Sequence, residues 1–550
     1  MIEQVKELKE KGIKSICLHG GMNQRDIDIA LDNCIYGDVK LLYLAPERLN
    51  SRLVYYRLRK MDINLIAIDE AHCISQWGHD FRPEYKELGK LKEDFEAPIL
   101  ALTGSATKKT RKDIIETLQL EKPKVILGSI YRPNLSYFIP KEYDKQKYLL
   151  NFLEKNDKHG LIYIRNRKKT EILSEWLNKK GYKSIFYHAG LSSKDRFSIQ
   201  NAWMRGEYPI IVCTNAFGMG INKSDLNWVM HFDLPSNMEE YYQETGRVGR
   251  DGSEANVITL WNDKDIELLD LHFEDSFPSK DLIKKVYQGI VNTLRLAVGS
   301  GEGEGFPVDI YEIAKKCSTK PRIVFNTIKL IERAGYWFLS EEEMTSSRIM
   351  FLMNNRSILR YSEKHPVFGN IIQTMLRSYS GLFTDLKNFD EEELAERCGM
   401  EKRDLIIALQ KMEEQDVLEY DRLNFLPKLF LTQPRVDLKN LKIPKSVYVD
   451  RKENIGSQLN QFKNFISNDK DCRYLILAKY FGESLDTKCG KCDNCTRRNP
   501  ISKERLFKLL PLSFEEANRL ENENRGTRHF IRRLLEEGVL MISNETILKR

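Results

Sequence analysis

Two adjacent carboxylates, Asp69 and Glu70, directly follow an apolar run at residues 65–68. The length and β-branched content of this run predict a buried parallel strand. Ligands of open α/β sheets bind at the carboxyl ends of the strands. Asp69 is suited to holding hydrated Mg²⁺ against nucleotide phosphates, and Glu70 to orienting the attacking water. The pair therefore predicts nucleotide hydrolysis, and a structural strand-end acid pair is the alternative.

Aromatic and basic residues follow the acidic pair closely. Trp77, Phe81 and Tyr85 are interleaved with His79 and Arg82. Aromatic rings stack on bases and basic groups meet phosphates, so this segment predicts contact with single-stranded nucleic acid. An aromatic cluster that only packs in a core is the alternative, but packing alone does not select so many polar and glycine positions in order.

The whole string at residues 69–85 resembles the Walker B box and aromatic-rich loop of the RecQ family of DNA helicases. The resemblance covers residues 1 to about 265 and resumes near Cys472. It implies an ATP-dependent motor that moves 3′ to 5′ on DNA, unwinds duplexes and acts in DNA repair and recombination. It also implies a catalytic role for His72, which lies within the box.

Two further boxes of the first half match the same family. Residues 45–49 contain Glu47 and Arg48, which the resemblance places on the nucleic-acid backbone. Residues 102–107 end a predicted strand and supply the hydroxyls of Thr103 and Ser105. These hydroxyls are suited to coupling the phosphate site to a partner lobe by short hydrogen bonds.

Candidate nucleic-acid contacts continue in the second half of the resemblance. Residues 214–223 form a glycine-broken strand end whose backbone amides are suited to DNA phosphates. Thr214, Asn222 and Lys223 are the candidate contacts in this segment. His188 lies in a further family box and is expected near the DNA track, with a purely structural histidine as the alternative.

Gln243, Arg247 and Arg250 form the last motor box. The spacing of the two arginines predicts that they share one face of a helical turn. From there they would reach across an interlobe cleft to the γ-phosphate, where an arginine finger neutralises developing charge. A solvated basic helix is the alternative.

Four of the ten cysteines are clustered toward the C-terminus. Tetrahedral Zn²⁺ needs four ligands, and two-residue spacers let neighbouring thiolates converge on one ion. Four cysteines without histidine also suit an iron–sulfur cluster. Residues 472–474 and 480–483 resemble the zinc platform of the RecQ family, which favours zinc. The expected ligands are Cys472, Cys489, Cys492 and Cys495.

Alternating β-rich and helical patterns must position these residues, and they predict an α/β fold. We expect two RecA-like parallel-sheet lobes, the first incomplete, followed by winged-helix-like segments and a four-cysteine zinc subdomain. Residues 132–134 (Arg-Pro-Asn) mark the crossover between the lobes, since proline disfavours helix there. The expected domains are residues 1–125 (partial first lobe, ATP-binding), 126–275 (second lobe), 276–455 (winged-helix-like segments), 456–500 (zinc-binding) and 501–550 (small helical or winged-helix-like segment).

Two segments after the motor share one pattern. Residues 309–337 and 390–420 each predict a short helix, a polar turn, a longer amphipathic helix and a β-prone ending. Both resemble winged helix-turn-helix units, with structural helical hairpins as the alternative. The glycine-rich run at residues 299–305 is interpreted as a flexible loop and not a phosphate loop, because its two glutamates repel phosphate.

Composition and targeting signals limit the function classes. The 550 residues are 41% hydrophobic and 30% charged, with a net charge of +7, which is permissive of nucleic-acid binding. Apolar runs stay shorter than the roughly 18 residues of a membrane span, and the charged start differs from a signal peptide. The expected location is cytoplasmic and DNA-associated.

No Gly-x-x-x-x-Gly-Lys-Ser/Thr occurs in the 550 residues, so the lysine that cradles the β- and γ-phosphates is missing from them. We expect an intact protein with a further strand, loop and helix upstream, and an inactive chain without them. The expected ligands are ATP with Mg²⁺, structural Zn²⁺, and single-stranded and duplex DNA. A non-catalytic DNA-binding protein and an RNA helicase are the alternatives.

Overall fold

The computed structural model describes most of the chain. It covers residues 1–19, 22–75, 82–156, 158–217, 223–340, 347–421, 427–496, 503–523, 527–536, 538–543 and 546–549. The chain divides into two compact units, residues 1–271 with 453–550, and residues 272–452. Within these stretches no helix is both long and apolar enough to cross a membrane.

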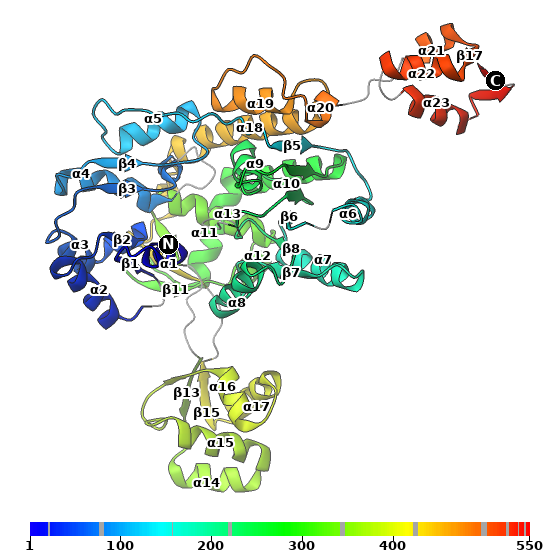
Figure 1. Ribbon diagram of the computed structural model, residues 1–550. Coiled ribbons are helices and arrows are strands. Elements are labelled where there is room, and N and C mark those ends of the chain that lie inside the picture. The colour runs from blue at the N-terminus through cyan, green and yellow to red at the C-terminus, as the bar shows by residue number, and fades with distance from the viewer. Residues whose placement is uncertain are drawn as a thin grey trace. The chain divides into compact units, whose positions relative to one another are not determined.

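Two pairs of parallel strands form the first lobe, drawn in blue shades in Figure 1. β1 (Ser15–Leu18) pairs with β2 (Leu41–Leu44), and β3 (Ile66–Ile68) pairs with β4 (Ile99–Ala101). Each pair has its own buried cluster. The parallel strands confirm the predicted class, but the described residues form two pairs and not one continuous sheet. The helices of this lobe are α1 (Ile2–Glu10), α2 (Gln24–Tyr36), η1 (Pro46–Asn50), α3 (Arg52–Leu58), η2 (Ala71–Ile74), η3 (Pro83–Lys90), α4 (Leu91–Asp94) and α5 (Lys108–Thr117).

An apolar strip remains exposed beside β4. Leu65, Leu100 and Leu102 are 54%, 44% and 45% exposed. Residues 125–127 (Val-Ile-Leu) are exposed as well, and together with β4 they line a hollow of about 1130 Å³. Open strand edges with apolar neighbours favour association with further chain.

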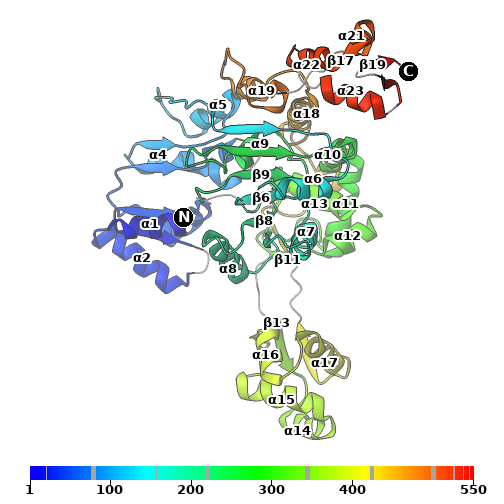
Figure 2. The ribbon, with the colours of Figure 1, turned by 45° about the vertical axis from the view of Figure 1, so that its right-hand side comes forward.

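The second lobe is one six-stranded sheet in which every strand pair is parallel. Figure 2 shows β6, β8 and β9 side by side within it. The central strands are buried on both faces, as apolar parallel strands covered by helices must be. In spatial order the strands are β5 (Leu135–Phe138), β10 (Ala255–Thr259), β9 (Trp228–His231), β6 (Gly160–Tyr163), β8 (Ile210–Cys213) and β7 (Ser184–Tyr187). The helices are α6 (Lys145–Leu153), α7 (Arg167–Lys179), α8 (Ser193–Met204), α9 (Met238–Thr245) and α10 (Asp263–Ser276).

The cysteine-bearing module packs on the second lobe. Figure 1 shows α18 (Lys445–Ser467) and α19 (Arg473–Phe481) beside β5 and α9. The rings of Tyr241 and Phe465 meet edge to face, with their centroids 5.2 Å apart. From Glu453 onward this module, which ends in the short α20 (Asp493–Thr496), therefore belongs to the same compact unit as the six-stranded sheet.

The second unit contains two winged-helix-like folds, and the sequence of the inner one is inserted within the sequence of the outer one. The outer fold has the antiparallel sheet β11–β16–β12, and the chain leaves it after β12 and returns at β16. The inner fold is built between these two strands around the sheet β14–β13–β15. The outer elements are α11 (Lys280–Thr293), β11 (Gly305–Pro307), α12 (Ile310–Lys316), α13 (Pro321–Arg333), β12 (Trp337–Leu339), β16 (Lys428–Leu431) and η4 (Leu438–Asn440). The inner elements are β13 (Ser347–Phe351), α14 (Asn355–Lys364), α15 (Pro366–Ser378), β14 (Lys387–Phe389), α16 (Glu391–Cys398), α17 (Lys402–Glu414) and β15 (Leu418–Asp421).

Backbone hydrogen bonds fasten the glycine-rich run at residues 299–305 to the outer winged-helix fold. The Gly303 amide donates to Leu431 O over 2.9 Å, and the Leu431 amide donates to Glu304 O over 3.1 Å. Gly299, Gly301 and Gly303 have positive φ values, which glycine adopts without strain. The segment is therefore a loop of hydrogen-bonded turns leading into β11, so the loop predicted here is confirmed, and backbone hydrogen bonds hold it to the outer fold.

The last described residues form a small helical and antiparallel module. Its sheet has the order β17–β19–β18, and its buried cluster includes Leu506, Leu534 and Ile547. Helix, strand, two helices and a hairpin follow one another in the order of a winged-helix unit. The elements are α21 (Lys503–Leu509), β17 (Leu512–Ser513), α22 (Phe514–Glu523), α23 (Thr527–Glu536), β18 (Leu540–Ser543) and β19 (Thr546–Lys549).

Candidate active site and zinc site

A left-handed backbone at Glu70 turns the chain sharply where β3 ends. Glu70 has φ 50°, a conformation that is uncommon for a non-glycine residue and often marks functional sites. The Asp69 carboxylate accepts a 2.8 Å hydrogen bond from the Glu70 amide. The Ala71 amide donates to Leu102 O over 2.9 Å, which ties the turn to the end of β4. Asp69 is left exposed at the carboxyl end of a parallel strand, where an ion ligand is expected.

His72 joins the acidic pair to the Thr103 box. Its imidazole is buried, and its Nδ1 lies 3.2 Å from a Glu70 carboxylate oxygen and 3.1 Å from Thr103 Oγ1. Thr103 Oγ1 in turn accepts a 3.3 Å hydrogen bond from the Ser105 amide. The structure therefore brings together Glu70, His72, Thr103 and Ser105, which come from two parallel strands that neighbour each other.

The expected DNA contacts of the first lobe are only partly described. Glu47 is exposed, and the Arg48 guanidinium donates to His19 O over 2.8 Å. The Arg82 amide donates to Cys73 O over 3.0 Å, so Arg82 lies beside the residues that follow the acidic pair. Trp77 and Phe81 lie outside the described residues.

The second-lobe arginines do not share a helical face. Asn237 caps the start of α9 by accepting a hydrogen bond from the Glu240 amide, and α9 ends at Thr245. The chain then turns through Gly246 and Gly249, and Gly249 has φ +60°. Arg247 is consequently buried while Arg250 is exposed, so the predicted helical turn is wrong. Gln243 is half-buried on α9 itself.

Arg247 enters a buried polar layer of the second lobe. Burial raises the pKa of Tyr163 well above its ordinary value, an effect opposed by the Arg247 charge and by its hydrogen bond to Tyr163. Burial also raises the pKa of Glu244, whose carboxylate lies 3.0 Å from His231 Nε2. Burial, together with the Arg247 and Arg132 charges, lowers the pKa of Arg250.

The guanidinium groups of Arg132 and Arg250 both donate to Gly246 O, over 3.2 Å and 3.4 Å, and Arg247 is the next residue in the chain. A concentration of positive charge of this kind suits an anionic ligand such as a phosphate.

Three expected DNA contacts of this lobe are internal. His188 is buried and its Nε2 lies 2.8 Å from a Glu171 carboxylate oxygen, which supports the structural alternative. Thr214 is buried at the end of β8, and its amide donates to Tyr187 O over 3.2 Å. Lys223 is only 6% exposed and pairs with Asp225 over 3.1 Å. Asn222 lies outside the described residues.

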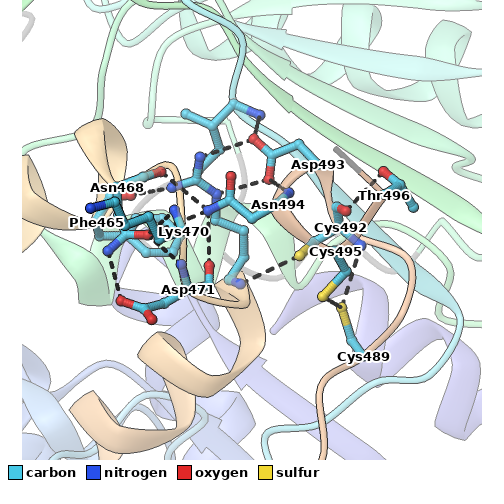
Figure 3. A network of polar contacts seen from close by, with 12 residues as sticks. Phe465, Asn468, Lys470, Asp471, Cys489, Cys492, Asp493, Asn494, Cys495 and Thr496 are labelled. Carbon is cyan, nitrogen blue, oxygen red and sulfur yellow. Dashed lines mark hydrogen bonds and ion pairs between the residues drawn. The ribbon is translucent and has the colours of Figure 1, made fainter. Parts of the chain in front are cut away.

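The four clustered cysteines converge on one point. Their sulfur atoms all lie within 4.8 Å of one another. Figure 3 shows the side chains of Cys489, Cys492 and Cys495 gathered beside α20. Backbone amides support the sulfurs, since the Cys489 amide donates to Cys472 Sγ and the Cys492 amide to Cys489 Sγ, each over 3.3 Å. Four soft ligands in this arrangement fit tetrahedral Zn²⁺.

Electrostatics prepare this cluster for a cation. A hydrogen bond from the Cys489 thiol is the main cause that lowers the pKa of Cys492 to about 5, and the Arg473 amide contributes to the same shift. The lowered pKa favours the thiolate, which is the form in which cysteine binds metal. Arg473 also pairs with Asp493 through two 2.9 Å contacts, so the residues next to two ligands hold each other in place.

Comparison with protein families shows what class of protein this architecture defines. Residues 1–114 match the DEAD/DEAH box helicase family, and residues 144–252 match the helicase conserved C-terminal domain. Residues 349–422 match the RecQ helicase winged-helix domain of Bacteroidota, and residues 437–496 match the RecQ zinc-binding domain. The class is a two-lobed helicase-type protein with a winged-helix region and a four-cysteine zinc site.

This combination of domains is similar to that of the RecQ family. The chain is 42% identical over 267 residues to an ATP-dependent DNA helicase RecQ of Pasteurella multocida, covering 48% of this chain and 42% of that protein. A RecQ of Haemophilus influenzae is 41% identical over 267 residues, covering 48% of this chain and 43% of its own length. The chain thus spans less than half of the length of these two relatives.

Sequence reasoning missed two residues that contact the arginine turn. Arg132 donates to the carbonyls of Gly246 and Gly249, and Asn134 Nδ2 donates to Gly249 O over 2.8 Å. Residues 132–134 were predicted to form the crossover between the lobes because of Pro133. The further signal was in the residues on either side of Pro133, because polar donors around a rigid proline suit contact with a distant turn.

Proposed function

We propose that this protein is an ATP-dependent DNA helicase that moves 3′ to 5′ on single-stranded DNA. The observation that carries the proposal is the chain of contacts from Glu70 through His72 to Thr103. These contacts join the Glu70 carboxylate, which is proposed to act in hydrolysis, to the end of the neighbouring strand β4. A movement at the end of one strand would therefore be transmitted to the end of the other. The RecQ relatives in Pasteurella multocida and Haemophilus influenzae are named as ATP-dependent DNA helicases, which supports the assignment.

Each residue of the site has a role that follows from its position. Asp69 is exposed at the strand end and would hold Mg²⁺, which supplies charge neutralisation on the nucleotide phosphates. Glu70 orients the attacking water, and His72 fixes the direction of the Glu70 carboxylate. Arg247 and Arg250 place positive charge on the second lobe, where developing phosphoryl charge is to be stabilised.

DNA binding is proposed for the first-lobe segment that follows the acidic pair. Arg82 is anchored through its backbone, and the proposed stacking residues Trp77 and Phe81 lie outside the described residues. Stacking on bases contributes roughly 1–3 kcal/mol per base. An occupied DNA track would be sensed at Glu70 through the backbone that links Arg82 to Cys73 and the turn at Glu70.

We further propose that these residues need a phosphate loop for turnover. The Gly-x-x-x-x-Gly-Lys-Ser/Thr motif does not occur in the 550 residues, and its amides and lysine position the phosphates for reaction. We expect negligible ATP hydrolysis from these residues alone. Joined behind a strand–loop–helix segment that carries the motif, the same residues should hydrolyse ATP in a DNA-stimulated manner.

The decisive experiment is Glu70→Gln in the chain that carries a phosphate loop. The rate of DNA-stimulated ATP hydrolysis should fall by at least about 100-fold, because general-base catalysis contributes roughly 10²–10⁴-fold. Binding of fluorescent single-stranded DNA should change less than about twofold. The matched control is Glu87→Gln, an exposed acid of the same lobe. A Glu70→Gln protein that hydrolyses ATP at the unsubstituted rate would rule out the assignment.

A further inference from the structure

The crossover between the lobes contacts the arginine turn through two side chains. The Arg132 guanidinium bridges the carbonyls of Gly246 and Gly249, the first over 3.2 Å. Asn134 Nδ2 donates to Gly249 O over 2.8 Å and to Ser253 O over 2.7 Å. These contacts fix the backbone on both sides of Arg247 and Arg250. Arg132 therefore holds the backbone of the arginine turn, in addition to being part of the segment that connects the lobes.

The zinc module holds the opposite side of the same crossover. The Tyr474 hydroxyl donates to Arg132 O over 2.5 Å, and Lys491 Nζ donates to Pro133 O over 2.6 Å. The Glu483 carboxylate accepts hydrogen bonds from the Ser129 hydroxyl over 2.5 Å and from the Ile130 amide over 2.9 Å. The crossover is therefore held from two sides. Residues 129–133 contact the zinc module, and the side chains of Arg132 and Asn134 donate to the arginine turn.

The residues of the zinc module that make these contacts are close in sequence to the ligands. Lys491 lies between Cys489 and Cys492, and Tyr474 is two residues after Cys472. Asp493 directly follows a ligand, pairs with Arg473 and accepts a 3.0 Å hydrogen bond from the Ile139 amide. The fold around the four sulfurs therefore determines where these anchors stand.

We propose that Arg132 is a positioning residue for the catalytic arginines, and that the zinc module sets its placement by holding residues 129–133. The inference rests on the proposed function, in which Arg247 and Arg250 meet the phosphates. In this proposal the zinc site contributes to ATP hydrolysis by positioning the catalytic arginines. The contacts involved begin at residues next to the zinc ligands, pass through residues 129–133 and end at Gly249. Asn134 supports the same turn from the neighbouring backbone position.

The chemistry of the bridge explains why an arginine occupies this position. A planar guanidinium offers several N–H donors in a fixed fork, so one side chain can hold two carbonyl oxygens at a defined separation. A lysine can reach the same region but offers one mobile point charge. Arg132 also adds positive charge beside Arg250, which keeps the region attractive to anions.

The test measures hydrogen exchange at the amides of residues 246–253 in the 550-residue chain, so it needs no ATP turnover. Arg132→Lys should raise exchange at these amides at least about fivefold, and Tyr474→Phe should raise it by a smaller factor. Zinc content should remain one ion per chain in both variants. Tyr448→Phe is the matched control, because it removes an equivalent hydroxyl-to-carbonyl contact, to Pro278 O, in the other unit. Unchanged exchange in Arg132→Lys with zinc retained would overturn the proposal.

A second measurement separates this inference from the proposed function. In the chain that carries a phosphate loop, Arg132→Lys should lower kcat for ATP about tenfold while KM changes less than about twofold. Arg247→Ala provides the reference. If Arg247→Ala lowers kcat and Arg132→Lys does not, the positioning role is wrong. If Arg247→Ala leaves kcat unchanged, the proposed function fails for this arginine, and the exchange data still decide whether Arg132 holds the turn.

Discussion

The Lys223 ammonium group lies 3.1 Å from an Asp225 carboxylate oxygen and 5.4 Å from the centre of the Trp203 ring. Its third neighbour is Met204 O, at 3.3 Å. A cation with these partners stabilises the loop that precedes β9. A phosphate contact would require Lys223 to leave a site in which its charge is already neutralised.

Replacing Lys223 by methionine should therefore affect folding and not DNA affinity. Loss of the buried Lys223 ammonium leaves Asp225 with His159 as its remaining partner and Met204 O without its donor, so we expect the free energy of unfolding to fall by about 1–3 kcal/mol, measured by urea denaturation. The salt dependence of DNA binding should keep its slope, whereas removal of a phosphate contact would reduce that slope by roughly 1.

Lys194→Met is the control, because Lys194 is exposed at the start of α8 and its loss should leave stability nearly unchanged. A reduced salt slope with intact stability in Lys223→Met would restore the original interpretation of Lys223 as a DNA contact.

Residue types could be predicted from the sequence, but burial could not. Asp69, Glu70 and Thr103 were singled out because polar groups follow apolar strands, and the structure brings this neighbourhood together. Lys223 and His188 were placed near DNA by resemblance, yet their carboxylate partners, Asp225 and Glu171, come from sequence positions with no motif of their own. Pairing of this kind depends on the tertiary fold.

At the scale of elements, the turn after α9 depends on Gly249. Its φ is +60°, and a Cβ placed there would lie 2.5 Å from Asn134 Nδ2 and 2.9 Å from Ser253 O. Both neighbours belong to the hydrogen-bonded contact with the crossover. A methyl group added at Gly249 would therefore strain the left-handed backbone and would also overlap with Asn134 and Ser253.

Gly249→Ala should lower the free energy of unfolding of the motor unit by about 2–4 kcal/mol, since left-handed strain and steric overlap act together. Gly252→Ala separates the two causes, because Gly252 has φ +85° but open space around its Cβ position. This control should cost only about 1 kcal/mol. The measurement is urea denaturation followed by circular dichroism. Equal losses in the two variants would show that Asn134 gives way and that the contact is soft.

Strands were easier to predict than the connections between them. The apolar runs at Leu41–Leu44 and Ile210–Cys213 belong to the β-rich segments of the sequence, and both are strands. The helical turn expected for Arg247 was wrong because Gly246 and Gly249 end the helix, a signal that the arginine spacing had overridden. The insertion of one winged-helix fold into the sequence of the other was not predicted, because hydrophobic periodicity reports local structure and not which strands pair.

At the scale of the whole molecule, the zinc site lies in the module that packs on the second lobe. Metal analysis of the purified chain should give one zinc ion, and Cys492→Ser should abolish its retention, because structural zinc supplies folding energy directly. Proteolysis within residues 484–496 should become faster in the variant. Cys34→Ser, a change on α2 away from the cluster, should keep one zinc. Iron with a visible absorbance band would instead indicate an iron–sulfur cluster.

The nested arrangement of the second unit has a consequence for the order of folding. Closing the outer sheet by pairing β12 with β16 encloses 88 residues, from Ser340 to Pro427, if the inner fold is not yet formed. The inner fold brings its own ends together, because Arg348 on β13 pairs with Asp421 on β15. The effective loop then shortens to about 15 residues, which reduces the entropic cost of closure by roughly 1.5 kcal/mol. The inner module should therefore become structured first during synthesis, since its sequence is completed before the last strand of the fold that surrounds it has been made.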